Sequence, residues 1–223
     1  MCPDPFVNGK DMQLYFAPKT ISIVAVIALE EARLDHELVK VDFAAAEQSS
    51  PAYGAINPKG RVPALVTDNG ILTETGAILE YIADLAPDAE LVPPAPYKAA
   101  KMREMMFYLA STMHVNHAHK MRGHRWADEQ TSWDDMAAKV PETMAQSCSY
   151  IEQNTLGGPY VLGDSFSLAD PYLYVVATWL KGDGVDTAAY PKLSAFIETM
   201  EKRSSVRAVL EGAFCETASL GSG

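Results

Sequence analysis

The segment Ile56–Leu65 places a tight turn directly before a short apolar stretch that carries a proline near its start. Pro58 and Gly60 favour the turn, and Pro63 follows within the apolar stretch. Proline has no N–H for a strand ladder and is therefore kept out of central paired strands. The backbone of Val62 is consequently predicted to remain free to pair with a peptide-like ligand that lies antiparallel to it.

A helix is predicted to begin at Glu74 and Thr75, because an apolar periodic pattern follows them. The first N–H groups of a helix have no partner within it, and its dipole is positive at that end. Such an end favours the carboxylate of a ligand. Together the two segments predict a small peptide held by backbone on one side and by a helix N-terminus on the other.

The composition excludes some partners. The 223 residues, enough for one large domain or two small ones, carry a formal net charge of −11, whereas nucleic acids and anionic membranes require clustered Lys and Arg. Cys2, Cys148 and Cys215 form no CxxC pair, so we expect neither a disulfide framework nor a thiolate metal site, and free thiols fit a cytoplasmic location. The N-terminus lacks a signal-peptide pattern, and the longest apolar run, Ile21–Leu29, is too short to span a bilayer.

The first part of the chain is predicted to be an α/β domain over residues 12–88, preceded by an extension over residues 1–11. The expected strands cover residues 13–17, 37–43, 62–66 and 71–73, and the expected helices cover 21–34 and 74–85. Asp68-Asn69-Gly70 predicts the turn of a hairpin between the last two strands. The order strand-helix-strand, then strand-strand-helix, is typical of a thioredoxin-like fold.

The second part is predicted to be all-helical. Four prolines between Pro87 and Pro96 indicate a linker, which we assign to residues 89–97. Residues 98–223 follow as a helical domain, with helices expected over 98–125, 133–155, 167–181, 191–202 and 204–211. Ser167-Leu168-Ala169-Asp170 fits a capping box at the start of one of them.

At these motifs, from about Leu14 to Leu210, the chain resembles the glutathione S-transferases. Leu14–Ser22 together with Ala28–Glu31 is most similar to the bacterial beta class. The resemblance implies a thioredoxin-like N-terminal domain, an all-α C-terminal domain that forms the second-substrate site, and a homodimer. It implies glutathione as cosubstrate, with no metal needed.

The implied reaction, typical of detoxification, is attack of the glutathione thiolate on a small electrophilic or apolar substrate. Alternatives on the same fold are a glutathione-dependent isomerase, an ether-cleaving enzyme or a peroxidase. An alternative of another class is a non-catalytic binding or regulatory protein that reuses the fold. The second-substrate helices do not distinguish the chemistries.

The resemblance also implies the peptide clamp, with the Val62–Pro63 bond cis. Glu74 and Thr75 match the acidic and hydroxyl pair that holds the γ-glutamyl end. An ordinary turn proline is the alternative interpretation of Pro63.

Two basic residues of the turn, Lys59 and Arg61, are candidates for the glycyl carboxylate of glutathione. The alternative is that both charges are simply solvated.

A hydroxyl at the first turn of a helix suffices to stabilise the thiolate. A hydrogen bond to a charged group is worth about 1.5–3 kcal/mol, which corresponds to about one to two pKa units below the usual thiol value. The candidates are Thr20 and Ser22, because Ile21 stands where the beta class usually has cysteine, and Phe16 where it has tyrosine. We favour Ser22, which follows the missing cysteine directly. Thr20 is the alternative, and either residue can instead serve as a helix cap.

Four histidines crowd one stretch of the expected long helix: His114, His117, His119 and His124. On a regular helix all except His119 fall within about 80° of one another. No carboxylate or cysteine completes an evident metal site, so no metal is expected. By resemblance His114 faces the active-site cleft, and Tyr108 and Ser111 on the preceding turns are expected to line it. A packed or solvated histidine is the alternative.

Overall fold

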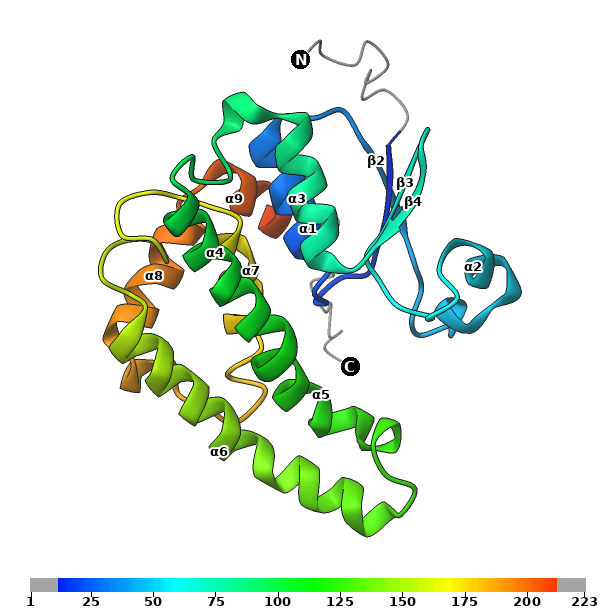
Figure 1. The fold of residues 1–223 in the computed structure, drawn as a ribbon. Coiled ribbons are helices and arrows are strands. Elements are labelled where there is room, and N and C mark those ends of the chain that lie inside the picture. Colours follow the sequence, from blue (N-terminus) through cyan, green and yellow to red (C-terminus); the bar gives the residue numbers. More distant parts are fainter. Residues whose placement is uncertain (1–11, 212–223) are drawn as a thin grey trace, which may run out of the picture. The chain divides into compact units, whose positions relative to one another are not determined.

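The computed structural model describes residues 12–211 (Figure 1). They divide into two units, one formed by residues up to Ala89 together with the segment from Arg203, the other by Glu90–Lys202. The predicted extension over residues 1–11 lies outside the described residues.

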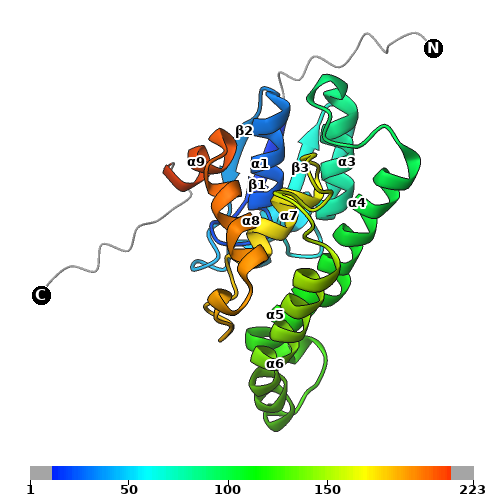
Figure 2. The ribbon, with the colours of Figure 1, turned by 90° about the vertical axis from the view of Figure 1, so that its left-hand side faces the viewer.

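The first unit is built on a sheet with the strand order β2-β1-β3-β4. Its strands are β1 (Gln13–Phe16), β2 (Glu37–Lys40), β3 (Ala64–Thr67) and β4 (Gly70–Thr73). β2 runs parallel to β1, and the other neighbouring strands are antiparallel. Helices α1 (Ile23–Ala32) and α3 (Thr75–Leu85) pack together on one face of the sheet, and α2 (Pro51–Ile56) lies on the other side (Figures 1 and 2). The predicted thioredoxin-like fold is confirmed.

Helix α1 forms although its sequence is rich in β-branched residues. Residues 23–29 are all buried, so α1 has no polar face and its first two turns are apolar all round. The helix ends at Arg33, which adopts a left-handed conformation with φ 53°. The prediction of a buried helix over this segment is therefore confirmed, with ends two residues shorter on each side.

The last described helix, α9 (Ser204–Glu211), contacts α1 and groups with the first unit rather than with the helical part that the sequence predicted for it. Arg203 donates two hydrogen bonds of 2.7 Å to the carboxylate of Glu31, and the Ser205 hydroxyl donates a third. Burial alone would raise the pKa of Glu31, but these bonds and the nearby positive charges outweigh it, so that pKa lies below its usual value.

Replacing Arg203 by Met should therefore destabilise the protein, by about 1–3 kcal/mol at neutral pH. Because the folded-state pKa of Glu31 is lowered, its contribution is present above the unfolded-state pKa and is lost as the pH falls through the folded-state pKa. Without Arg203 this loss should begin at a higher pH. Urea unfolding between about pH 3 and pH 7 measures both effects. Lys202→Met is the control, and an equal loss of stability in both variants would contradict the prediction.

The second unit is helical, as predicted. Its α-helices are α4 (Pro96–Tyr108), α5 (His114–Arg122), α6 (Gln130–Asn154), α7 (Ala169–Ala177) and α8 (Pro191–Glu201). The single long helix expected over residues 98–125 is interrupted by a π-helical segment, Leu109–Met113, and closes with a 3-10 turn, Gly123–Arg125. α5 lies against α6 (Figure 2).

Two buried polar groups support the core of this unit. Asp170, at the start of α7, accepts hydrogen bonds from the backbone N–H groups of Ser167 and Val161, both 2.7 Å, which is the carboxylate half of the predicted capping box. Cys148 is buried in α6, and burial raises the pKa of its thiol to about 12, which keeps the thiol protonated and inert.

None of the helices within residues 12–211 is long and apolar enough to span a membrane.

Candidate active site

The turn before β3 carries the peptide clamp predicted from the sequence. The Val62–Pro63 peptide bond is cis, as expected. Val62 is buried, yet within residues 12–211 its backbone N–H group has no hydrogen-bond partner. Because a backbone N–H seeks a hydrogen-bond partner, this one is available to pair with a ligand.

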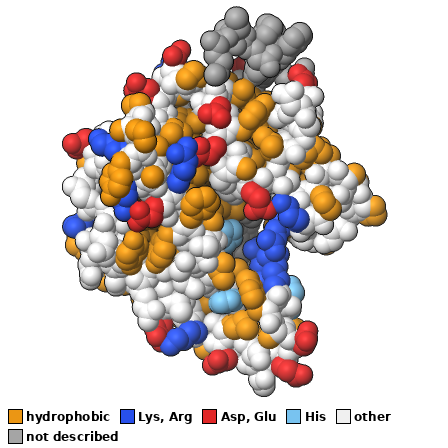
Figure 3. All heavy atoms as spheres, in the orientation of Figure 1, with side chains coloured by type: hydrophobic (Ala, Val, Ile, Leu, Met, Phe, Trp, Pro, Cys, Tyr) orange, Lys and Arg blue, Asp and Glu red, His pale blue; other side chains and the backbone are white. Residues whose placement is uncertain are grey.

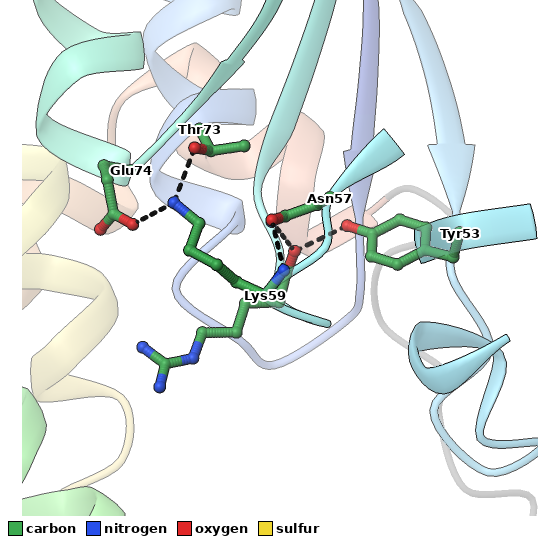
Figure 4. Close-up of polar contacts among 6 residues, drawn as sticks. Tyr53, Asn57, Lys59, Thr73 and Glu74 are labelled. Carbon is green, nitrogen blue, oxygen red and sulfur yellow. Dashed lines mark hydrogen bonds and ion pairs between the residues drawn. The ribbon is translucent and has the colours of Figure 1, made fainter. Parts of the chain in front are cut away.

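The turn is held from behind by α2. The Tyr53 hydroxyl and the Asn57 side-chain amide both donate to the carbonyl oxygen of Arg61, at 2.7 and 2.6 Å (Figure 4). The side-chain oxygen of Asn57, Oδ1, accepts the Lys59 N–H at 3.1 Å. Gly60 has φ 61°, the left-handed conformation that glycine adopts without cost.

The Lys59 side chain reaches the start of α3. Its Nζ lies 2.5 Å from a carboxylate oxygen of Glu74 and donates to the Thr73 hydroxyl at 2.7 Å (Figure 4). The side chain of Arg61 is exposed. Lys59 is therefore directed to the Glu74 end of the site, whereas the sequence suggested the glycyl end for both basic residues.

Helix α3 opens with an unusual backbone. Glu74 has φ 74° and ψ 121°, a conformation that non-glycine residues rarely adopt and that clusters at functional sites. Thr75, the first helical residue, is buried. Among the described residues the backbone N–H groups of Thr75, Gly76 and Ala77 have no hydrogen-bond partner. Three free N–H groups at the positive end of a helix can bind a carboxylate.

The two hydroxyl candidates lie together before α1. Thr20 Oγ1 and Ser22 Oγ are 2.7 Å apart, and Thr20 also donates to the Ala17 carbonyl at 2.8 Å. Ser22 Oγ accepts the Ala17 N–H at 3.0 Å. Ser22 is fully buried, whereas Thr20 is partly exposed. Of the two residues only Thr20 has surface that a ligand can reach.

The three residues predicted to line the second-substrate cleft have different neighbours in the helical unit. The Tyr108 ring lies 4.9 Å from that of Tyr150 on α6, and the Ser111 hydroxyl donates to the Phe107 carbonyl at 2.8 Å. The His114 ring lies 5.1 Å from that of Trp179. Their role in binding a second substrate stays a prediction.

The four histidines contact three different tryptophans. His114 and His117 pack on Trp179, whereas His119 contacts Trp126 and His124 contacts Trp133. The helix changes to a 3-10 turn at Gly123, so His124 leaves the face that a regular helix would give it. Histidine side chains reach the surface of this unit (Figure 3). Within residues 12–211 no group of three or more His, Cys, Asp or Glu side chains is arranged to hold a metal ion.

Comparison with known proteins identifies the family. A family model of the glutathione S-transferase N-terminal domain matches residues 10–84, and one of the C-terminal domain matches residues 117–212. A glutathione transferase homologue from Sulfitobacter, solved with bound glutathione, is 60% identical over 91% of this chain and 98% of that chain, with a TM-score of 0.89. The chain belongs to the glutathione S-transferase family.

Other relatives support the same family assignment. Glutathione S-transferase GST-4.5 from Xanthomonas campestris pv. campestris is 31% identical to this chain, over 90% of this chain and 98% of the Xanthomonas protein. The beta-etherase LigF from Sphingobium sp. strain SYK-6 is 25% identical, with a TM-score of 0.77, over 90% of this chain and 98% of that one.

The sequence pattern does not single out Asp183, a buried acidic residue of the helical unit. Asp183 Oδ2 lies at hydrogen-bond distance, 2.7 Å, from His117 Nδ1, and Asp183 Oδ1 lies 3.5 Å from Lys120 Nζ. Its side chain has no exposed surface. Asp183 stands in a turn 66 residues beyond His117, so no local pattern could connect the two.

Replacing Asp183 by Asn should remove the charge and keep the shape. His117 and Lys120 would lose their buried acidic partner, so we expect the free energy of unfolding to fall by about 1–3 kcal/mol. Thermal unfolding measures the loss. The exposed Asp186→Asn serves as control, and equal melting temperatures for both variants and the wild type would contradict a stabilising role of Asp183.

Proposed function

We propose that this transferase conjugates the thiolate of glutathione, its cosubstrate, to a small electrophilic or apolar substrate. The observation that carries the proposal is the unpartnered N–H of Val62 beside the cis Val62–Pro63 bond. An extended peptide completes such a backbone by antiparallel pairing. The 60% identical Sulfitobacter homologue, solved with bound glutathione, supports the choice of peptide.

In this proposal the two ends of glutathione use different parts of the first unit. The γ-glutamyl carboxylate binds the N–H groups at the start of α3 and the Thr75 hydroxyl, and its ammonium group binds Glu74. Thr75 is buried and Glu74 exposed, which suits a bound carboxylate and a solvated ammonium group, respectively. Arg61 is proposed for the glycyl carboxylate, and Lys59 for the γ-glutamyl end through its contact with Glu74.

The Thr20 hydroxyl is proposed to donate to the sulfur, with Ser22 supporting it. Ser22 Oγ and the Ser22 N–H, at 2.7 and 3.3 Å, can both donate to Thr20 Oγ1. The Thr20 hydrogen, which donates to the Ala17 carbonyl in the structure, is proposed to turn from that oxygen to the thiolate when glutathione binds. The Ala17 N–H in turn donates to Ser22 Oγ. Such a chain of donors strengthens its last hydrogen bond.

Ether cleavage by attack of the same thiolate is the second candidate reaction, and the likeness to the beta-etherase LigF favours it. In either reaction Tyr108, Ser111 and His114 are the proposed second-substrate residues. Product analysis with an activated aryl chloride and with an aryl ether distinguishes the two reactions. Isomerisation and peroxide reduction require substrates of their own, a compound with a cis double bond and an organic hydroperoxide. Neither reaction leaves a glutathione conjugate: the first regenerates glutathione and the second yields its disulfide.

Calorimetric titration with glutathione, followed by turnover of the aryl chloride, tests the proposed function. Binding with turnover supports a transferase. Binding without turnover of any of these substrates would favour a regulatory protein that reuses the fold, and absence of binding would remove the proposal.

We also propose that the protein is a cytoplasmic homodimer, as the family usually is, and that it acts in detoxification. Light scattering of the purified protein distinguishes a dimer from a monomer.

A further inference from the structure

Two side-chain donors converge on one backbone oxygen next to the clamp. The Tyr53 hydroxyl and the Asn57 amide reach the Arg61 carbonyl from 2.7 and 2.6 Å (Figure 4). A carbonyl oxygen has two lone pairs, so this one is fully used. Both donors come from α2 and the residue that follows it, so the turn is fastened to that helix.

The Arg61 carbonyl shares its planar peptide group with the N–H of Val62. Of the described peptide bonds only Val62–Pro63 is cis, so the Arg61–Val62 bond is trans. In a trans peptide the C=O and N–H bonds point in opposite directions. Fixing the Arg61 oxygen toward α2 therefore fixes the Val62 N–H away from α2.

We infer that Tyr53 and Asn57 are positioning residues that hold the Arg61–Val62 peptide in the orientation in which the Val62 N–H receives glutathione. This inference rests on the proposed function. Neither residue touches the ligand: each acts through the direction of a single peptide plane.

The surroundings keep both donors in place. Tyr53 is 3% and Asn57 1% exposed. Burial raises the pKa of Tyr53 to about 12, so its hydroxyl remains a donor at any pH of interest. The side-chain oxygen of Asn57 accepts the Lys59 N–H, so the side-chain nitrogen of Asn57 faces the Arg61 carbonyl. A flipped amide would lose both bonds.

Either donor alone should hold the oxygen less firmly than both together, so each single variant should lose part of the affinity. Tyr53→Phe and Asn57→Asp are each expected to weaken S-methylglutathione binding by about two- to tenfold. The double variant frees the peptide to rotate and should lose more than the product of the two single effects. Turnover at saturating glutathione should stay within about twofold of wild type, since the sulfur chemistry is unchanged.

Calorimetry with S-methylglutathione measures these affinities without titrating the thiol. Tyr15→Phe is the matched control, because the Tyr15 ring packs 5.9 Å from the Tyr53 ring while no hydrogen bond of its hydroxyl exists among the described residues. Far-ultraviolet circular dichroism and thermal unfolding verify that every variant is folded.

Asn57→Asp gives a second readout, which keeps the test decisive if the double variant does not fold. The ionised carboxylate cannot donate, whereas its protonated form can. Affinity relative to wild type should therefore recover as the pH is lowered, and a general loss of structure would not produce this rescue. Wild-type affinity in Tyr53→Phe, together with the absence of rescue in Asn57→Asp, would overturn the inference. Failure of the wild-type protein to bind would instead overturn the proposed function.

Discussion

Replacing Thr20 by Val is expected to lower turnover by about ten- to a hundredfold while glutathione affinity changes by less than about twofold. Valine matches threonine in shape and removes only the hydroxyl. The thiolate then loses a hydrogen bond to a charged group, worth about 1.5–3 kcal/mol. The pKa of bound glutathione should rise by about one to two units, so the deficit should close at high pH. Steady-state kinetics with an activated aryl chloride across a pH series measures both quantities.

Thr20→Ser is the control for this prediction, because it keeps the hydroxyl and should retain most of the turnover. Ser22→Ala is the decisive comparison. Because Ser22 is proposed only to support Thr20, Ser22→Ala should reduce turnover less than Thr20→Val does. A large loss in Ser22→Ala, with Thr20→Val near wild type, would return the direct role to Ser22.

Replacing Thr75 by Val should raise the dissociation constant of S-methylglutathione by about ten- to a hundredfold. The buried hydroxyl is proposed to donate to the γ-glutamyl carboxylate, and valine leaves that end of the ligand without this donor. Turnover at saturating glutathione should change little, because the sulfur is proposed to lie at the start of α1, away from Thr75. Calorimetry gives the affinity, and saturation kinetics gives the turnover.

An analogue that lacks the γ-glutamyl carboxylate completes a double-mutant cycle for Thr75. Wild type and Thr75→Val should bind this analogue equally, while Thr75→Ser should behave as wild type toward both ligands. An equal loss of affinity for both ligands in Thr75→Val would show that the substitution damages the site in general and would contradict the proposed contact.

The features that the sequence predicted well are encoded locally. The hairpin of β3 and β4 follows from the turn residues between them, and α3 follows from its apolar periodicity. The cis Val62–Pro63 bond came from the family resemblance and is confirmed. In each case residues adjacent in sequence determine the structure.

The apolar pattern of the sequence does not predict helix α2, although the start of this helix carries a local signal. Ser50 accepts the Tyr53 N–H, and Pro51 occupies the first helical position, which together form a standard helix start. The segment covers only six residues, too few for a periodic pattern. Its importance lies in Tyr53 and Asn57, whose contacts with Arg61 depend on the folded turn.

Other features depend on contacts that are distant in sequence. The contact of Arg203 with Glu31 spans 172 residues and groups α9 with the first unit, and that of His117 with Asp183 spans 66. The family pattern favours Ser22 because this residue follows the missing cysteine, but the complete burial of Ser22 results from the packing of α1. Sequence patterns do not report how deeply a side chain is buried.

A crystal structure with S-methylglutathione would locate the cysteinyl residue of the tripeptide relative to Val62, the contact on which the proposed binding of glutathione depends. We expect the Val62 N–H to donate to the cysteinyl carbonyl at about 2.9 Å, with the sulfur beside Thr20. A tripeptide bound with the Val62 N–H unengaged would contradict this expectation.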